Sequence, residues 1–312
     1  MIIHPLFLCH FFVFALQFAK SRNMKKMTFY TLLSLLSFTW IIMGFKPAEE
    51  IIDLKTAIAN KIITVEFIST GAYSGESLMM KVKNLNAKKL NIRISAGTYF
   101  DAPNDDEQNL IIPQEDLLVI EPKATKEKLL NGFCTNMKNA APNSGEHFIL
   151  GTINIKGMAD FLGIIKGKKM ENYTVQSAIW ALTDQEPVSN IDGGNTAEVD
   201  VLRKELFKIT GQKETWYKSR QAYVVNEDRQ INTETLTING KLNFQTIKGA
   251  AIHEEIYDSE GKMLFKLSET IAKLGGDVGY EFNLKVKGWK KGNYEIRLMD
   301  GTKLVKKFDF IV

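Results

Sequence analysis

The sequence predicts a mainly β protein in which two β-sandwiches, the C-terminal one immunoglobulin-like, flank a central α/β segment. Three observations lead to this fold class. Apolar residues alternate before residue 122 and again after residue 231, and between these regions they follow helical spacing with capping signals. The chain has 312 residues, of which 45% are hydrophobic and 24% charged, so it has enough material for two or three domains.

Residues 1–46 are predicted to be a signal peptide. Lys25 and Lys26 precede an uncharged apolar run, Thr28 to Phe45, which is the layout of a secretory signal. The simplest interpretation is that translation starts at Met24 and that residues 1–23 are a misassigned upstream extension. A two-helix membrane anchor is the alternative, although both apolar runs are at or below the length that spans a bilayer. We therefore expect a bacterial protein that is secreted or located in the cell envelope or on the outer surface.

The charge balance excludes one class of partner. Residues 1–46 contain five basic residues and no acidic one, and the rest of the chain has 35 basic and 36 acidic residues. A nearly neutral mature region is not typical of a nucleic-acid-binding protein. We expect contact with a membrane only through the leader.

Three segments follow the leader. Residues 47–122 read as an N-terminal β-sandwich or open barrel, with apolar alternation interrupted by turn signals. Residues 123–230 contain four candidate helices: Ala124 to Leu130, Met158 to Ile165, Thr174 to Leu182, and one capped by Asn195, with Glu198 as capping-box partner, and ended by Gly211. Residues 231–312 return to alternation and are predicted to form the immunoglobulin-like sandwich.

Cysteine use points to one unusual residue. The chain contains only Cys9 and Cys134, so removal of the leader leaves Cys134 as the sole thiol of an exported protein. An unpaired thiol in that compartment is expected to be intermolecular, reactive or chemically masked.

The sequence around this thiol carries a resemblance. The motif Gly132-Phe133-Cys134 and the later motif Val175-Gln176-Ser177-Ala178-Ile179-Trp180 together resemble the thioester domains of bacterial surface adhesins. The resemblance covers about Leu129 to Asp184, and the segment between Cys134 and Gln176 is short for that family. It implies an internal thioester between Cys134 and Gln176, supported by Gly132, Phe133 and Trp180.

The chemistry explains the need for these residue types. Attack of the Cys134 thiolate on the Gln176 carboxamide expels ammonia, and the acyl–sulfur bond must then be shielded from water until a nucleophile arrives. On a helix, Trp180 lies one turn after Gln176, so its indole is expected to cover the carboxamide. Gly132 is expected to allow close backbone approach. The implied function is a covalent adhesin with single-turnover chemistry, rather than an enzyme, and its partner is a protein or another amine-bearing surface ligand.

Two other interpretations stay open. In the first, Cys134 is a small buried hydrophobic residue, Gln176 a surface amide and Trp180 part of a core, and the protein is a β-sandwich binding or structural protein without covalent chemistry. In the second, Cys134 pairs with His147 or His253 in a cysteine hydrolase.

Cofactor and metal sites are not expected. The stretch Asn104 to Glu107 lacks the alternating ligands of a calcium loop and is predicted to be a solvated turn. Gly193 and Gly194 precede a helix but lack the spacing of a phosphate loop.

Overall fold

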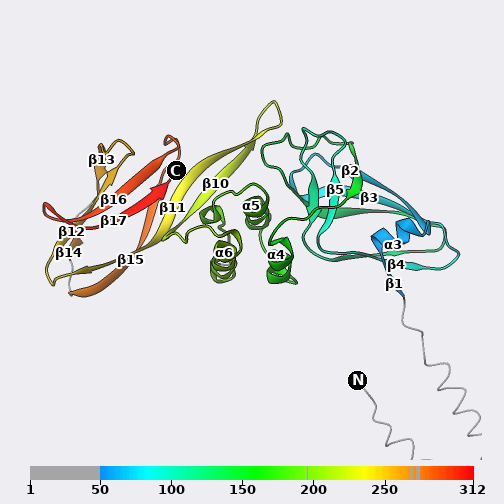
Figure 1. The fold of residues 1–312 in the computed structure, drawn as a ribbon, viewed down its shortest axis with the longest axis horizontal. Helices are drawn as coiled ribbons and strands as arrows, with labels where there is room; N and C mark the ends of the chain where they lie inside the picture. Colours follow the sequence, from blue (N-terminus) through cyan, green and yellow to red (C-terminus); the bar gives the residue numbers. More distant parts are fainter. Residues whose placement is uncertain (1–49, 195, 268–269, 272–274) are drawn as a thin grey trace, which may run out of the picture. The chain divides into compact units, whose positions relative to one another are not determined.

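The structure, a computed structural model, describes residues 50–194, 196–267, 270–271 and 275–312 (Figure 1). It is mainly β, as the sequence predicts, with helices between two β regions. The predicted signal peptide (1–46) and the predicted helix cap Asn195 lie outside the described residues. Within the described part of the chain, no helix is both long enough and apolar enough to cross a membrane.

A closed barrel forms the first β region. Its strands are arranged in the order β2-β3-β8-β6-β5-β9. Their bounds are β2 (Ile63–Ser69), β3 (Ser74–Asn84), β5 (Thr98–Asp101), β6 (Leu110–Ile112), β8 (Thr125–Cys134) and β9 (His147–Gly151). The sequence predicts a sandwich or open barrel here. Closure gives every barrel strand two neighbours, so no edge is left unpaired in this ring.

A small sheet and a short helix pack beside the barrel. The strands β1 (Ile51–Asp53), β4 (Leu90–Ile94) and β7 (Asp116–Ile120) pair in the order β1-β4-β7, and α3 (Leu54–Ala59) follows β1 directly. The Asp53 carboxylate caps α3 by accepting a hydrogen bond from the Lys55 N–H at 3.0 Å. Buried residues of the small sheet, α3 and the barrel form one hydrophobic cluster.

The helix predicted at Ala124 to Leu130 is wrong, because this segment belongs to β8. Its residues pair antiparallel with β3, from Lys83 opposite Thr125 to Ser74 opposite Phe133. Long-range pairing within the barrel overrides the local helix propensity. Barrel strands therefore come from both sides of the predicted boundary at residue 122.

Three helices form a layer against one face of the barrel (Figure 1). They are α4 (Met158–Ile165), α5 (Asn172–Thr183) and α6 (Thr196–Thr210), with the 3-10 turn η2 (Val188–Asn190) between α5 and α6. The predicted helices over these segments are confirmed, and Gly211 ends α6 with a φ of 73° as expected. The layer buries the barrel side chains Tyr99, Ile111 and Phe133.

Two sheets share one hydrophobic core in the C-terminal region. The first has the order β10-β11-β15, with β10 (Tyr217–Val225), β11 (Ile231–Thr246) and β15 (Gly276–Lys285). The second has the order β13-β12-β16-β17, with β14 also on β12; the bounds are β12 (Ala251–Tyr257), β13 (Met263–Lys266), β14 (Thr270–Ile271), β16 (Asn293–Asp300) and β17 (Lys303–Ile311). The predicted boundary at residue 231 falls within the β10–β11 hairpin.

Candidate functional site

The structure brings Cys134 and Gln176 together although they are 42 positions apart. Cys134 is the last residue of β8, where its N–H donates to the Tyr73 carbonyl at 2.9 Å. Gln176 lies in the second turn of α5, on the helix layer that covers the barrel. Cys134 has no exposed surface and Gln176 is 1% exposed. The expectation that Gln176 is a surface amide, made in the non-covalent interpretation, is therefore wrong.

Two hydrogen bonds join the Gln176 carboxamide to the backbone of Cys134. The Cys134 N–H donates to Gln176 Oε1 at 3.2 Å, and Gln176 Nε2 donates to the Cys134 carbonyl at 2.7 Å. If the amide were flipped, Gln176 Nε2 would face the Cys134 N–H and Gln176 Oε1 would face the Cys134 carbonyl, and neither pair could form a hydrogen bond. The backbone therefore fixes the orientation of the carboxamide. The Gln176 carboxamide is consequently held against the backbone of Cys134.

Burial controls the chemistry of the thiol. It raises the pKa of Cys134 far above the ordinary value, because a thiolate would be desolvated among apolar side chains. The thiol therefore keeps its proton in the folded protein. The thiolate is the nucleophilic form of cysteine, so burial lowers the reactivity of Cys134 in the folded protein.

Aromatic rings pack in the hydrophobic cluster that contains Cys134. Trp180 is completely buried; its ring stacks on Tyr73 with centroids 6.1 Å apart and meets the edge of Tyr223 at 5.0 Å. Tyr223 also shares a hydrogen bond with the Ser177 hydroxyl, 2.8 Å away, and stacks on Tyr173 at 5.3 Å. Such rings exclude water and keep the local dielectric low.

The other predicted site residues have separate roles. Phe133 faces the helix layer, whereas Cys134 belongs to the barrel cluster together with Trp180. A Cβ atom on Gly132 would lie 2.5 Å from Ser77 Oγ, so this position requires the close approach that only glycine allows.

Neither candidate histidine is hydrogen-bonded to Cys134. His147 is exposed on β9, and the buried His253 lies on β12 with its Nε2 3.1 Å from Glu255 Oε1. The described residues contain no group of His, Cys, Asp and Glu side chains that could hold a metal ion.

The acidic turn at Asn104 to Glu107 is only partly as predicted. Asn104, Asp105 and Asp106 are exposed, but Glu107 is 2% exposed and receives the Arg229 guanidinium at 2.9 Å. The prediction of a wholly solvated turn is wrong for Glu107, because its ionic partner comes from the distant β10–β11 turn. Glu107, Arg229, Tyr73 and Tyr223 are the residues that sequence reasoning missed, and no local motif marks them.

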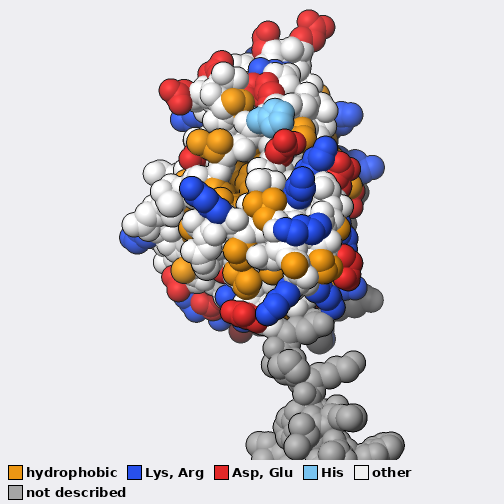
Figure 2. Space-filling view, turned by 90° about the vertical axis from the view of Figure 1, so that its right-hand side faces the viewer, with side chains coloured by type: hydrophobic (Ala, Val, Ile, Leu, Met, Phe, Trp, Pro, Cys, Tyr) orange, Lys and Arg blue, Asp and Glu red, His pale blue; other side chains and the backbone are white. Residues whose placement is uncertain are grey.

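Surface features near the site are modest. A groove with a volume of about 500 Å³ runs beside the end of α5 and is lined by Asn136, Lys138, Asn139, Ile153 to Lys156, and Leu182 to Asp184. On the barrel end shown in Figure 2, apolar, basic and acidic side chains are intermixed.

Comparison with known proteins adds little. No family model and no curated protein match the chain. Among solved structures, the β-glucosidase from Kluyveromyces marxianus is similar over 75% of this chain and 44% of its own length, with 7% identity and a TM-score of 0.19. The match spans less than half of that enzyme, and a likeness this weak supports no argument about fold or activity.

Proposed function

We propose that this chain is an exported surface or secreted binding protein whose Cys134 and Gln176 form an internal thioester that captures amine nucleophiles. The observation that carries the proposal is the two-point hydrogen bonding of a buried carboxamide to the backbone of a buried cysteine. These bonds hold the Gln176 carboxamide against the residue that carries the only thiol outside residues 1–46.

The proposed reaction balances without a cofactor or metal. The sulfur of Cys134 attacks the Gln176 carbonyl carbon, the carbon–nitrogen bond breaks, and the thiol proton leaves with the nitrogen as ammonia. Negative charge on Oε1 in the transition state is stabilised by the Cys134 N–H, which already donates to that atom. A primary amine of a partner then attacks the thioester and forms an amide with the Gln176 acyl group; the carbon–sulfur bond breaks, and a proton from the amine passes to the Cys134 sulfur.

The remaining architecture suits display and adhesion. The two C-terminal sheets around one core are proposed to be an immunoglobulin-like sandwich, a common support for binding surfaces. Residues 1–46 are proposed to be a signal peptide that is absent from the mature protein. The proposed partner is a protein or another surface ligand that carries amines.

A non-covalent binding protein is the second candidate. It is favoured by the fact that both hydrogen-bonding groups of Gln176 are satisfied without any covalent bond. In that case the two hydrogen bonds tie α5 to the barrel, and Cys134 stays a free thiol.

Intact-mass measurement of protein purified from its native host separates these candidates. We expect a mass that lacks residues 1–46 and one ammonia, and a thiol that resists alkylation in denaturant. Hydroxylamine or methylamine should free the thiol and leave its own adduct on Gln176, as a hydroxamate or an N-methyl amide. Cys134→Ala and Gln176→Ala should each abolish the ammonia loss. Gln108→Ala is a matched control, because Gln108 is also buried and bonds a backbone carbonyl, that of Asn139, at 2.9 Å.

Two outcomes would contradict the proposal. A chain of full mature mass, whose Cys134 alkylates at once on unfolding, would contradict the thioester and leave the non-covalent binding protein. Recovery of residues 1–46 in membrane-bound protein would contradict the signal peptide.

A further inference from the structure

We infer that the outer half of the β10–β11 hairpin is a hinged cover over the Cys134–Gln176 pair, latched to the barrel by Arg229. The inference deepens the proposed function by assigning its regulation, and it rests on that function for the meaning of the cover. Figure 1 shows the hairpin extending past α5 towards the barrel.

The outer half of the hairpin differs from its base in how it is paired. Strand β15 pairs with β11 only from Thr237 to Thr246, so Ile231 to Thr235 of β11 pair with Gln221 to Val225 of β10 alone. A two-stranded ribbon is marginally stable by itself. The outer half therefore depends on its contacts with α5 and the barrel.

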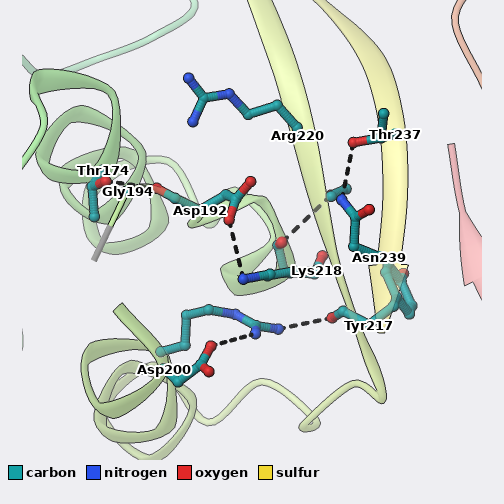
Figure 3. Close-up of polar contacts among 12 residues, drawn as sticks. Thr174, Asp192, Gly194, Asp200, Tyr217, Lys218, Arg220, Thr237 and Asn239 are labelled. Atoms are coloured by element: carbon teal, nitrogen blue, oxygen red, sulfur yellow. Dashed lines mark hydrogen bonds and ion pairs between the residues drawn. The ribbon is translucent and has the colours of Figure 1, made fainter. Parts of the chain in front are cut away.

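The base, by contrast, is fixed to the helix layer (Figure 3). Lys218 Nζ lies 3.3 Å from Asp192 Oδ1, and Arg203 donates to the Tyr217 carbonyl at 2.8 Å. The Ser219 hydroxyl donates to Asn190 Oδ1 at 2.7 Å, in a buried position. The Arg220 guanidinium lies over the Tyr173 ring, 4.0 Å from its centroid.

A hinge lies where the two halves meet. The pairing of β10 and β11 shifts register between Arg220 and Gln221. A β-bulge of this kind bends the strand and interrupts the ladder of hydrogen bonds. The outer ribbon can rotate there while the base stays attached.

The ribbon covers the α5 turns that carry the site. Tyr223 contacts Trp180 and Ser177, which follow Gln176 on α5, and the Gln221 N–H donates to the Tyr173 hydroxyl at 3.0 Å. Tyr223 and Ile231 also pack in the hydrophobic cluster that contains Cys134 and Trp180. Lifting the ribbon would uncover Trp180, and with it the route to the thioester.

The latch is at the tip of the hairpin. The Arg229 guanidinium contacts the buried Glu107 carboxylate at 2.9 Å and the Ala141 carbonyl at 2.8 Å, and the Arg229 carbonyl accepts the Ala141 N–H at 2.7 Å. Charged hydrogen bonds to a buried carboxylate are stronger than the exposed contacts of Gly288 with Glu234 and of Lys291 with Thr233 on the β11 side.

One feature of the closed state favours opening. The indole Nε1 of Trp180 is buried and has no hydrogen-bond partner among the described residues. Water that enters beneath a lifted ribbon would satisfy this donor, which offsets part of the cost of exposing the ring. The cover is thus held mainly by packing and by the Arg229 latch.

The test measures native-state access to the site in Arg229→Asn, because Asn tolerates the left-handed backbone of this position, where φ is 62°. If the intact mass shows the thioester, the readout is the rate of methylamine capture. If the mass shows a free thiol, the readout is the rate of Cys134 alkylation by iodoacetamide without denaturant. The intact mass thus tests whether the proposed thioester forms, and the reaction rate tests whether the hairpin limits access to the site.

We expect Arg229→Asn to raise either rate by about tenfold, the effect of losing one charged hydrogen bond. The control Arg297→Ala removes the ion pair with Glu295 on β16, far along the chain from the hairpin, and should leave the rate unchanged. Amide hydrogen exchange should accelerate in Gln221 to Val225 and Ile231 to Thr235 but not in Thr237 to Thr246. An unchanged rate, an equal rise in the control, or exchange that accelerates equally in all three segments would overturn the inference.

Discussion

Replacement of Trp180 provides a direct test of how the site is packed. Trp180→Ala removes a completely buried ring that contacts Tyr73 and Tyr223. Trp180→Phe keeps an aromatic ring in that space but deletes the indole N–H, which has no hydrogen-bond partner in the described part of the chain. The two variants therefore separate the loss of packing from the loss of the polar group.

The expected magnitudes differ strongly. Truncation of a buried Trp to Ala costs about 3–5 kcal/mol of unfolding free energy, because a cavity stays where the ring was. In Trp180→Phe, the smaller cavity lowers the unfolding free energy by about 1 kcal/mol. Removal of the unpaired indole N–H raises it by a similar amount, because folding no longer has to take that donor out of water. We expect Trp180→Phe to lie within about 1 kcal/mol of the wild type.

Urea denaturation followed by far-UV circular dichroism measures these differences as shifts in midpoint at constant slope. Trp216→Phe is a control for an indole that has a partner, because the partly buried Trp216 donates from Nε1 to the Asp309 carbonyl at 2.7 Å and its deletion leaves that carbonyl without this donor. We expect the control to lose more stability than Trp180→Phe. If Trp180→Phe were as unstable as Trp180→Ala, the indole N–H would have a binding partner and the reasoning would be refuted.

Two further predictions concern pH and domain boundaries. If Cys134 is a free thiol, its raised pKa keeps it neutral in the folded state, whereas the unfolded thiol ionises above its pKa of about 8.5. The contribution of this thiol to stability is therefore complete below that pH and falls as pH rises, so we expect the unfolding free energy to drop by about 2 kcal/mol from pH 8 to pH 10 relative to Cys134→Ala. A protein with the thioester should show no such difference. A fragment beginning at Lys213 should unfold cooperatively and be more stable by about 3 kcal/mol than a fragment of 231–312, because Trp216 and Tyr217 belong to the C-terminal core. Thermal unfolding measures the difference. Equal stability of the two fragments would show that β10 is dispensable.

Local patterns predicted the helices well and the β8 strand badly. Segment 158–165 has apolar residues at helical spacing and contacts consistent with that spacing, so the prediction and α4 agree. Segment 124–130 contains good helix formers, but its residues pair with β3, about fifty residues earlier in the chain. Pairing with distant strands is invisible to a local pattern, and here it decides the conformation.

The candidate site shows the same division. The pairing of Cys134 with Gln176 was implied by the resemblance of their flanking residues to thioester domains, and the structure brings the two residues together. The rings of Tyr73 and Tyr223 were not predicted, because neither has a motif; Tyr73 reaches Trp180 from the connection before β3, and Tyr223 from β10. Glu107 was misjudged for the same reason, since its exposure depends on Arg229, more than a hundred residues later.

The sequence by itself determined the features that depend on neighbours along the chain: the mainly β composition, the periodicity of the α4, α5 and α6 segments, the near-neutral charge after residue 46, and the single cysteine in that region. Only the tertiary structure decided the closure of the barrel, the burial of Gln176 against Cys134, and the position of the β10–β11 hairpin over α5. The reason is physical: helix periodicity and charge are local properties, whereas strand partners, burial and ionic contacts depend on which distant segments share a core.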